Sequence, residues 1–259
     1  MYLRNVLSLF LLAATPPVWA DACVAPGDVV IEDPAGDAPF LLLGDAPAGT
    51  PATAFLDITG ISIAAPAAAE GEDAKIIFSI QTSGQFPSPA LPPNFAVFSS
   101  FLDSRNLVRG VRMQADSMGL PHFFSYVAGA NGADPPGFDG RFVEEGSQVP
   151  AEAESNYGAD GVVTIVVKAK TLRAETGSVL SGVNGGTVAA VAVEGVGGLL
   201  AFVTDEVPAA LERGTGFFQI PDCAAKSVAA KQGSGLLAGG LPLALLMPLM
   251  LVALTRRRS

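Results

Sequence analysis

Two stretches of the sequence, LDITGISI at residues 56–63 and KIIFSIQ at residues 75–81, decide the fold class. In both, apolar side chains alternate with polar or small ones, and most of the apolar residues are β-branched. A period of two is typical of strands that bury one face. The segment between them, residues 64–72, has the Ala, Pro, Gly and Glu content of a loop. Because the connection is short, we expect an antiparallel pair.

The same pattern recurs along the central part of the chain. It predicts further strands at residues 29–32, 96–102, 108–116, 122–127, 161–168, 187–193 and 199–202. Helical periodicity is confined to a short turn at residues 169–176. Strands without intervening helices predict an all-β antiparallel sandwich with Greek-key-like or jelly-roll-like connections. Its expected aromatic core is Phe78, Phe95, Phe98, Phe101, Phe123, Phe124 and Phe202.

The first twenty residues carry the features of a secretion signal. Arg4 is the only early charge, an apolar run follows at residues 6–14, and VWA at residues 18–20 fits a small-x-small cleavage site. The apolar run is about half as long as the roughly twenty residues that a membrane-spanning helix needs. We therefore expect cleavage before Asp21 and export of the mature chain.

The C-terminal residues predict a membrane segment. Residues 236–254 contain no charge and are followed by an arginine cluster, which should stay on the cytoplasmic side and leave the domain outside. A Gly-rich lead-in, an apolar helix and terminal arginines resemble the GlyGly-type sorting signals of Gram-negative bacteria, which implies a membrane-embedded sorting protease as a partner. A permanent anchor and a processed tail are the two alternatives. The residues that carry this signal are Gly239, Gly240, Arg256, Arg257 and Arg258.

These ends divide the chain into five parts. They are a signal peptide (1–20), an extracytoplasmic domain (21–230), a Gly/Ser linker (231–235), a transmembrane or sorting helix (236–254) and a basic cytoplasmic tail (255–259). The net charge is −10, and the basic residues are scattered along the sequence with no clustered face evident. Because phosphate binding needs concentrated positive charge, this composition excludes nucleic acid as the expected partner.

The two cysteines, Cys23 and Cys223, lie near the two ends of the domain. In an oxidising compartment they most simply form a disulfide, which would tie these ends together. Closing so long a loop would stabilise the fold by on the order of 4 to 5 kcal/mol in the chain-entropy model. Lipidation of Cys23 is the alternative, but the residues before it lack the large aliphatic side chain of a lipobox.

Several turn and strand motifs follow one another in a recognisable order. DPAGD at residues 33–37 precedes the two strands quoted first, a Pro-rich loop lies at residues 87–93, and YGADGVVTIVV occupies residues 157–167. Together these motifs resemble DOMON domains and family 9 carbohydrate-binding modules over much of residues 33–205. The resemblance implies an exported β-sandwich that binds a carbohydrate or haem at the cell surface or in the periplasm.

Asp33, Asp37 and Asp57 are candidate ligands of Ca²⁺. A hard cation takes several carboxylate and carbonyl oxygens, and the turn at Gly36 would bring these side chains close together. Family 9-like modules often hold a structural calcium near such a turn, so the resemblance implies the same ion here. The alternative is ordinary turn chemistry, in which aspartates accept backbone N–H groups.

His122 is the only histidine, and Met113 and Met118 precede it. Some DOMON-like domains bind haem through Met and His, so the resemblance makes these three residues candidate haem ligands. The alternative is a partly buried strand histidine. For sugar binding, aromatic platforms are scarce, because Trp19 leaves with the signal and only Tyr126 and Tyr157 remain as tyrosines of the mature chain.

Residues for catalysis are equally few. One histidine and two paired cysteines leave too few ligands for an ordinary zinc site and no Cys nucleophile, and no G-x-S-x-G turn presents a serine. The carboxylates Glu144, Glu145, Glu152 and Glu154 lie in a polar loop and are interpreted as a solvated acidic patch.

The sequence therefore predicts a non-enzymatic module, tethered to the envelope, that interacts with a glycan or another envelope protein. A carbohydrate-binding or haem-binding module is the alternative, and a carboxylate-dependent hydrolase is a third.

Overall fold

The computed structural model describes residues 22–36, 54–130, 138–192, 199–207 and 216–223, of which the side chains of 138–139, 190–192, 199–204 and 206–207 are not described. The expected signal peptide, sorting tail and Gly/Ser linker lie outside these residues. Within them, no helix is both long and apolar enough to cross a membrane.

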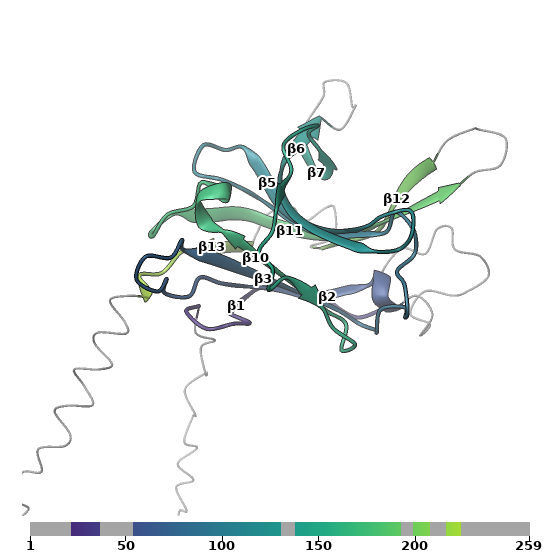
Figure 1. The fold of residues 1–259 in the computed structure, drawn as a ribbon, viewed down its shortest axis with the longest axis horizontal. Coiled ribbons are helices and arrows are strands. Elements are labelled where there is room, and N and C mark those ends of the chain that lie inside the picture. Colours follow the sequence, from purple (N-terminus) through teal and green to yellow (C-terminus); the bar gives the residue numbers. More distant parts are fainter. Residues whose placement is uncertain (1–21, 37–53, 131–137, 193–198, 208–215, 224–259) are drawn as a thin grey trace, which may run out of the picture.

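The described residues form two antiparallel sheets that lie one above the other (Figure 1). The smaller sheet has the strand order β1-β2-β3-β10-β9. Its strands are β1 (Asp28–Glu32), β2 (Ile58–Ala64), β3 (Lys75–Thr82), β10 (Val162–Lys168) and β9 (Asn156–Tyr157). Strand β10 pairs with β3 along its whole length, although six strands separate the two in the sequence.

The larger sheet has the strand order β12-β11-β4-β5-β6-β7, with β13 also paired to β11 and β8 to β6. Its strands are β4 (Ala96–Leu102), β5 (Val108–Ala115), β6 (Pro121–Ala130), β7 (Phe138–Val143), β8 (Val149–Pro150), β11 (Val179–Ala192), β12 (Leu199–Val207) and β13 (Gly216–Gln219). Two short 3-10 helices, η1 (Ala54–Leu56) and η2 (Ala169–Leu172), lie in connections. The predicted all-β antiparallel class is confirmed.

The core lies between the sheets and follows the alternation in the sequence. Each strand of the smaller sheet turns every second residue inward, so that Ile76, Phe78 and Ile80 of β3 are fully buried. Phe78 stacks on Phe101 of β4, with ring centroids 5.8 Å apart and planes at 11°. Burying one such side chain contributes about 1.5–3 kcal/mol, so this row holds the sheets together.

The predicted aromatic core is divided between two faces. Phe78, Phe95 and Phe101 lie in the main core, and Phe123 packs partly buried against it. Phe98 lies in a separate small cluster with Ala96 and Val188. This cluster is on the outer face of the larger sheet, since Phe98 alternates along β4 with the inward residues Val97 and Phe101. Phe202, whose side chain is outside the described set, is not placed.

Strand β7 covers part of that outer face. The Tyr126 hydroxyl donates a hydrogen bond to the Gly140 carbonyl, and the Arg112 Nη1 donates one to the Arg141 carbonyl at 2.9 Å. A side chain at Gly140 would overlap the Ser100 hydroxyl, so the strand lies directly on the sheet. Arg112 is thus buried, and burial lowers the pKa of its guanidinium.

The predicted Cys23–Cys223 disulfide is present, with the two Cα atoms 5.6 Å apart. A hydrogen bond reinforces the junction, because the Ala65 N–H donates to the Ala22 carbonyl at 2.7 Å, and the Cys223 sulfur packs 3.0 Å from the Ala65 carbonyl oxygen. The first and last described parts of the domain therefore meet at one end of the sandwich. A disulfide is typical of proteins that fold in an oxidising, exported environment.

Candidate functional site

The aspartate turn is built around Asp57, which is almost completely buried. Its Oδ2 accepts a hydrogen bond from the Gly36 N–H at 2.7 Å, and the Asp33 N–H donates to the Thr59 carbonyl at 3.0 Å. These bonds dock the DPAG turn on the start of β2, which is the turn chemistry expected of aspartate. Asp37 lies outside the described residues.

The second carboxylate oxygen of Asp57 differs from the first in its contacts. The Oδ1 atom of Asp57 is buried and makes no hydrogen bond to any residue that the structure describes. The neighbouring Ile58 N–H donates to Asp205 Oδ2 at 2.6 Å, so a second buried carboxylate lies close by, which sequence reasoning missed. Among the described residues, no three His, Cys, Asp or Glu side chains are grouped as metal ligands. The calcium site stays a prediction, with Asp57 Oδ1 as its best-placed donor.

The structure does not bring the candidate haem ligands into one pocket. Met113 is fully buried in the main core, whereas His122 and Met118 are exposed near the β5–β6 turn. The Nε2 atom of His122 lies 3.3 Å from Asp116 Oδ2. The hydrogen bond from His122 and two from backbone N–H groups lower the pKa of Asp116, the largest effect coming from the Leu120 N–H.

The tyrosines considered for sugar binding and two of the glutamates considered for catalysis are engaged in contacts within the domain. Tyr126 is buried, and Tyr157 packs edge-on against Phe86 with ring centroids 5.6 Å apart, so neither presents an open flat face. Glu152 and Glu154 both lie within salt-bridge distance of Lys75, at 3.9 and 2.6 Å. These ion pairs at the surface agree with the interpretation of the two glutamates as part of a solvated charged patch.

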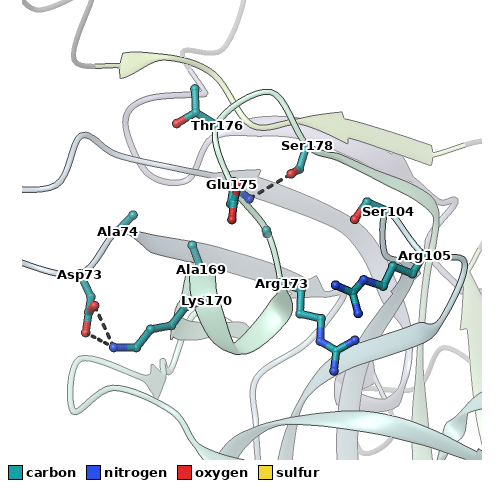
Figure 2. Close-up of a pocket in the computed structure, with 11 residues that line it drawn as sticks. Asp73, Ala74, Ser104, Arg105, Ala169, Lys170, Arg173, Glu175, Thr176 and Ser178 are labelled. Carbon is teal, nitrogen blue, oxygen red and sulfur yellow. Dashed lines mark hydrogen bonds and ion pairs between the residues drawn. The ribbon is translucent and has the colours of Figure 1, made fainter.

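A pocket of about 750 Å³ opens at one end of the sandwich, where three connections meet (Figure 2). They are the segment before β3, the turn between β4 and β5, and the segment from η2 to β11. The lining residues are Asp73, Ala74, Ser104, Arg105, Ala169, Lys170, Arg173, Ala174, Glu175, Thr176 and Ser178.

A buried ion pair holds two walls of the pocket together. Arg109 Nε donates to Asp103 Oδ2 at 2.7 Å, with both side chains more than nine-tenths buried. The other oxygen of Asp103 accepts the N–H groups of Arg105 and Leu107 at 2.8 and 3.0 Å, which shapes the β4–β5 turn. Arg109 Nη1 also lies 3.4 Å from the Thr171 carbonyl in η2. This pair therefore fixes the turn that carries Arg105 against the helix that leads to Arg173.

Arg105 and Arg173 are the unusual members of the lining. Both side chains are exposed and extend toward the same side of the pocket in Figure 2. Within the part of the chain that the structure describes, neither guanidinium makes a hydrogen bond or an ion pair, although Glu175 lines the same pocket. Guanidinium groups bind carboxylates and phosphates through paired N–H donors. Arg105 and Arg173 therefore present N–H donors that no group of the described residues occupies.

The backbone at Arg173 adds to this interpretation. Arg173 ends η2 in the left-handed conformation, with φ 53° and ψ 38°. Glycine is the usual residue at such a position, because any other L residue is strained there by roughly 1 kcal/mol. An arginine at this position keeps a long cationic side chain directed over the pocket at a small cost in stability.

The opposite side of the pocket is already neutralised. Lys170 Nζ contacts both carboxylate oxygens of Asp73 at 2.9 Å, and Lys168 Nζ lies 3.1 Å from Asp73 Oδ2. Hydrogen bonds from Lys170 and then Lys168 lower the pKa of Asp73. Hydroxyl groups of Ser104, Thr176 and Ser178 complete the polar lining. The pocket thus has one side with two unpaired guanidinium groups and one ion-paired side, and its lining also contains three hydroxyls and the Glu175 carboxylate.

The sequence did not reveal this cluster. Arg105, Lys170 and Arg173 were part of a basic set judged to be scattered, and the fold corrects that judgement for these three. They gather because the β4–β5 turn and the η2 segment, far apart in the sequence, meet at the same end of the two sheets. Comparison of the chain with protein-family models, curated proteins and solved structures finds no match.

Proposed function

We propose that this chain is a non-enzymatic binding module of the cell envelope, exported and tethered by its C-terminal segment, which holds an acidic ligand in the end pocket. The observation that carries the proposal is the pair Arg105 and Arg173, whose guanidinium groups line an open pocket and have no carboxylate partner among the described residues. Two like charges in one pocket repel each other, and an oxyanion between them would relieve that repulsion.

The charge of the whole chain supports binding of an acidic ligand at the pocket rather than elsewhere on the surface. The chain has 25 acidic and 15 basic residues, so an acidic ligand would be repelled by most of the surface. A site for such a ligand must therefore offer unpaired cations, as this pocket does with Arg105 and Arg173. Hydroxyls in the same lining suit a ligand that carries neutral polar groups beside its acid.

The disulfide supports the extracytoplasmic part of the proposal. It joins Cys23, just after the expected signal cleavage site, to Cys223, just before the linker and tail. A domain closed in this way would be held to the envelope at one end only, through the segment after Cys223. Signal cleavage before Asp21 and retention of residues 236–254 remain part of the proposal.

Calorimetric titration tests the binding function. The chain from Asp21 to Ser259, held in nanodiscs of neutral lipid, would be titrated with glucuronate and glycerol phosphate, and with glucose and glycerol as uncharged counterparts. We expect binding of at least one acid and not of its uncharged counterpart. The variant R105Q/R173Q should lose at least about tenfold in affinity, since each charge-assisted hydrogen bond contributes about 1.5–3 kcal/mol.

A matched variant controls for net charge. R141Q/K75Q removes two positive charges outside the pocket lining and should bind like the wild type. Equal weakening in both double variants would mean that only overall charge matters, and no binding of either acid would contradict the proposal.

A further inference from the structure

We infer that the acid held by the end pocket is the phosphate headgroup of an anionic phospholipid, in the membrane to which the tail leads. This inference rests on the proposed function and names the partner of the same site. Three independent observations carry it, namely the position of the pocket, the apolar side chains around it and the distribution of charge.

The pocket lies beside the point where the described chain ends. The Gly177 N–H donates to the Ile220 carbonyl at 2.9 Å, and the Ile220 N–H donates to the Ser178 carbonyl at 2.9 Å. These bonds attach the pocket wall to the segment that leads from Ile220, three residues later, to Cys223 and its disulfide. Residues 224–235 then lead to the uncharged segment 236–254. At about 3.4 Å per residue this connection spans at most about 45 Å, so Cys223 lies within that distance of the expected membrane segment.

Exposed apolar side chains lie at the pocket end, as Met118 and Leu120 do at the opposite β5–β6 turn, but here they adjoin unpaired arginines. Phe217 is 70% exposed and Val179 is 41% exposed. The two share the solvent face of the β11–β13 pair, because Ser181 pairs with Phe217 and Val179 pairs with Gln219. Leu107, which is 39% exposed, lies two residues after Arg105 in the β4–β5 turn. Apolar and aromatic side chains next to arginines are typical of surfaces that rest in the headgroup region of a membrane.

The charge distribution favours this orientation. The domain as a whole is acidic and would be repelled by an anionic bilayer, but the pocket end presents Arg105 and Arg173 unpaired. Basic groups next to a membrane segment bind anionic lipid, and the attraction falls off within a Debye length. Of the two ends of the described sandwich, the pocket end therefore suits close approach to anionic lipid better.

A single introduced tryptophan reports this approach. Trp19 is the only tryptophan of the chain and belongs to the expected signal peptide, so F217W places the sole indole of the mature chain beside the pocket. The chain from Asp21 to Ser259 would be reconstituted in vesicles that contain brominated phosphatidylcholine, with or without phosphatidylglycerol. We expect quenching at position 217 to be about twofold stronger with phosphatidylglycerol, because anionic lipid holds the pocket end at the headgroups.

A matched probe lies at the far end of the sandwich. Leu120 is 51% exposed in the β5–β6 turn, which is opposite the β4–β5 turn because consecutive antiparallel strands turn at alternate ends. L120W should show little quenching in either vesicle. In the F217W background, R105Q/R173Q should abolish the response to phosphatidylglycerol, whereas R105K/R173K, which keeps both charges, should retain it.

The outcomes separate this inference from the proposed function. Quenching that is indifferent to phosphatidylglycerol, or unaffected by R105Q/R173Q, overturns the lipid assignment. If the calorimetric titration nevertheless shows binding of glucuronate that depends on the two arginines, the module binds a soluble acid or an acidic glycan, and the proposed function stands alone. If neither acid binds and quenching is also indifferent, both proposals fall.

Discussion

Removing Arg109 should destabilise the domain and loosen the pocket at the same time. The Asp103 side chain is 1% exposed, and Arg109 is its only oppositely charged partner among the described residues. In R109M the carboxylate keeps its two backbone N–H donors but loses its countercharge. Breaking a buried pair by deleting one member costs about 3–5 kcal/mol, because an uncompensated charge is left behind. For a domain of this size that corresponds to a fall in Tm of about 6–20 °C.

The loss of unfolding free energy in R109M should become smaller as the pH falls. Burial alone would raise the pKa of Asp103, but hydrogen bonds from Arg109 and from the N–H groups of Leu107 and Arg105 outweigh it and hold the pKa below its usual value. A lowered folded-state pKa stabilises the fold above the unfolded value of about 3.9, and this stability is lost as the pH falls through the folded pKa. In R109M the pKa of Asp103 should rise. The difference between wild type and variant should therefore narrow from neutral pH toward about pH 4.

Urea denaturation of both proteins at a series of pH values measures this difference. K75M, which removes the exposed partner of Glu154, serves as control and should change the unfolding free energy far less. A loss in R109M below about 1 kcal/mol, typical of an exposed pair, would refute the reasoning, as would a larger loss that stays constant with pH.

Four further outcomes follow from the structure. C23S/C223S should lower the unfolding free energy by about 2–5 kcal/mol, measured by chemical denaturation under non-reducing conditions, since the bond spans 200 residues; an unchanged midpoint would contradict this. G110A should lower it by about 1–3 kcal/mol, because the new methyl group would overlap the Tyr126 ring, and a neutral effect in the same assay would mean that the ring moves freely. R112M should raise the unfolding free energy by about 1–4 kcal/mol, since within the described chain the buried guanidinium has an Nε without a hydrogen-bond partner and no carboxylate beside it. A clear loss of stability would show that the charge is compensated. Calcium should raise the Tm of the wild type but not of D57N, and the absence of any rise would end the calcium hypothesis.

The strands that the sequence predicted well are those with one face in the main core. The interval 75–81 became β3 (Lys75–Thr82) and 96–102 became β4, because burial of every second side chain leaves a period of two in the sequence. The start of β2 is later than expected. Leu56 belongs to η1, and the Ser83 N–H donates to the Asp57 carbonyl before the ladder begins at Ile58.

The strands that were missed owe their conformation to neighbours rather than to their own pattern. Strand β7 is not among the strands predicted from the sequence and is positioned by the Tyr126 and Arg112 side chains beneath it. The first half of β11, which contains Gly182, Gly185 and Gly186, lacks alternation but has partners on both sides in β4 and β13. Contacts of this kind join distant parts of the chain and leave no local period.

The functional residues also divide into those that the sequence predicts and those that only the fold brings together. The cysteine pairing followed from counting, because two thiols in an exported domain have one simple arrangement. The pocket did not follow from the sequence, since Arg105 and Arg173 are separated by six strands and are brought to one end by the buried Asp103–Arg109 pair. Nothing in the spacing of the basic residues indicates that two of them end without a carboxylate partner.

The arginine Nε–Hε signals in a proton–nitrogen correlation spectrum test the central claim most directly. The chain in neutral-lipid nanodiscs would be titrated with glycerol phosphate or glucuronate, with each signal assigned by substitution. The account predicts that the signals of Arg105 and Arg173 shift together and reach saturation, while those of Arg109 and Arg112, which are buried outside the pocket, stay in place. Signals of Arg105 and Arg173 that do not move, or a uniform drift of all arginines, would contradict it.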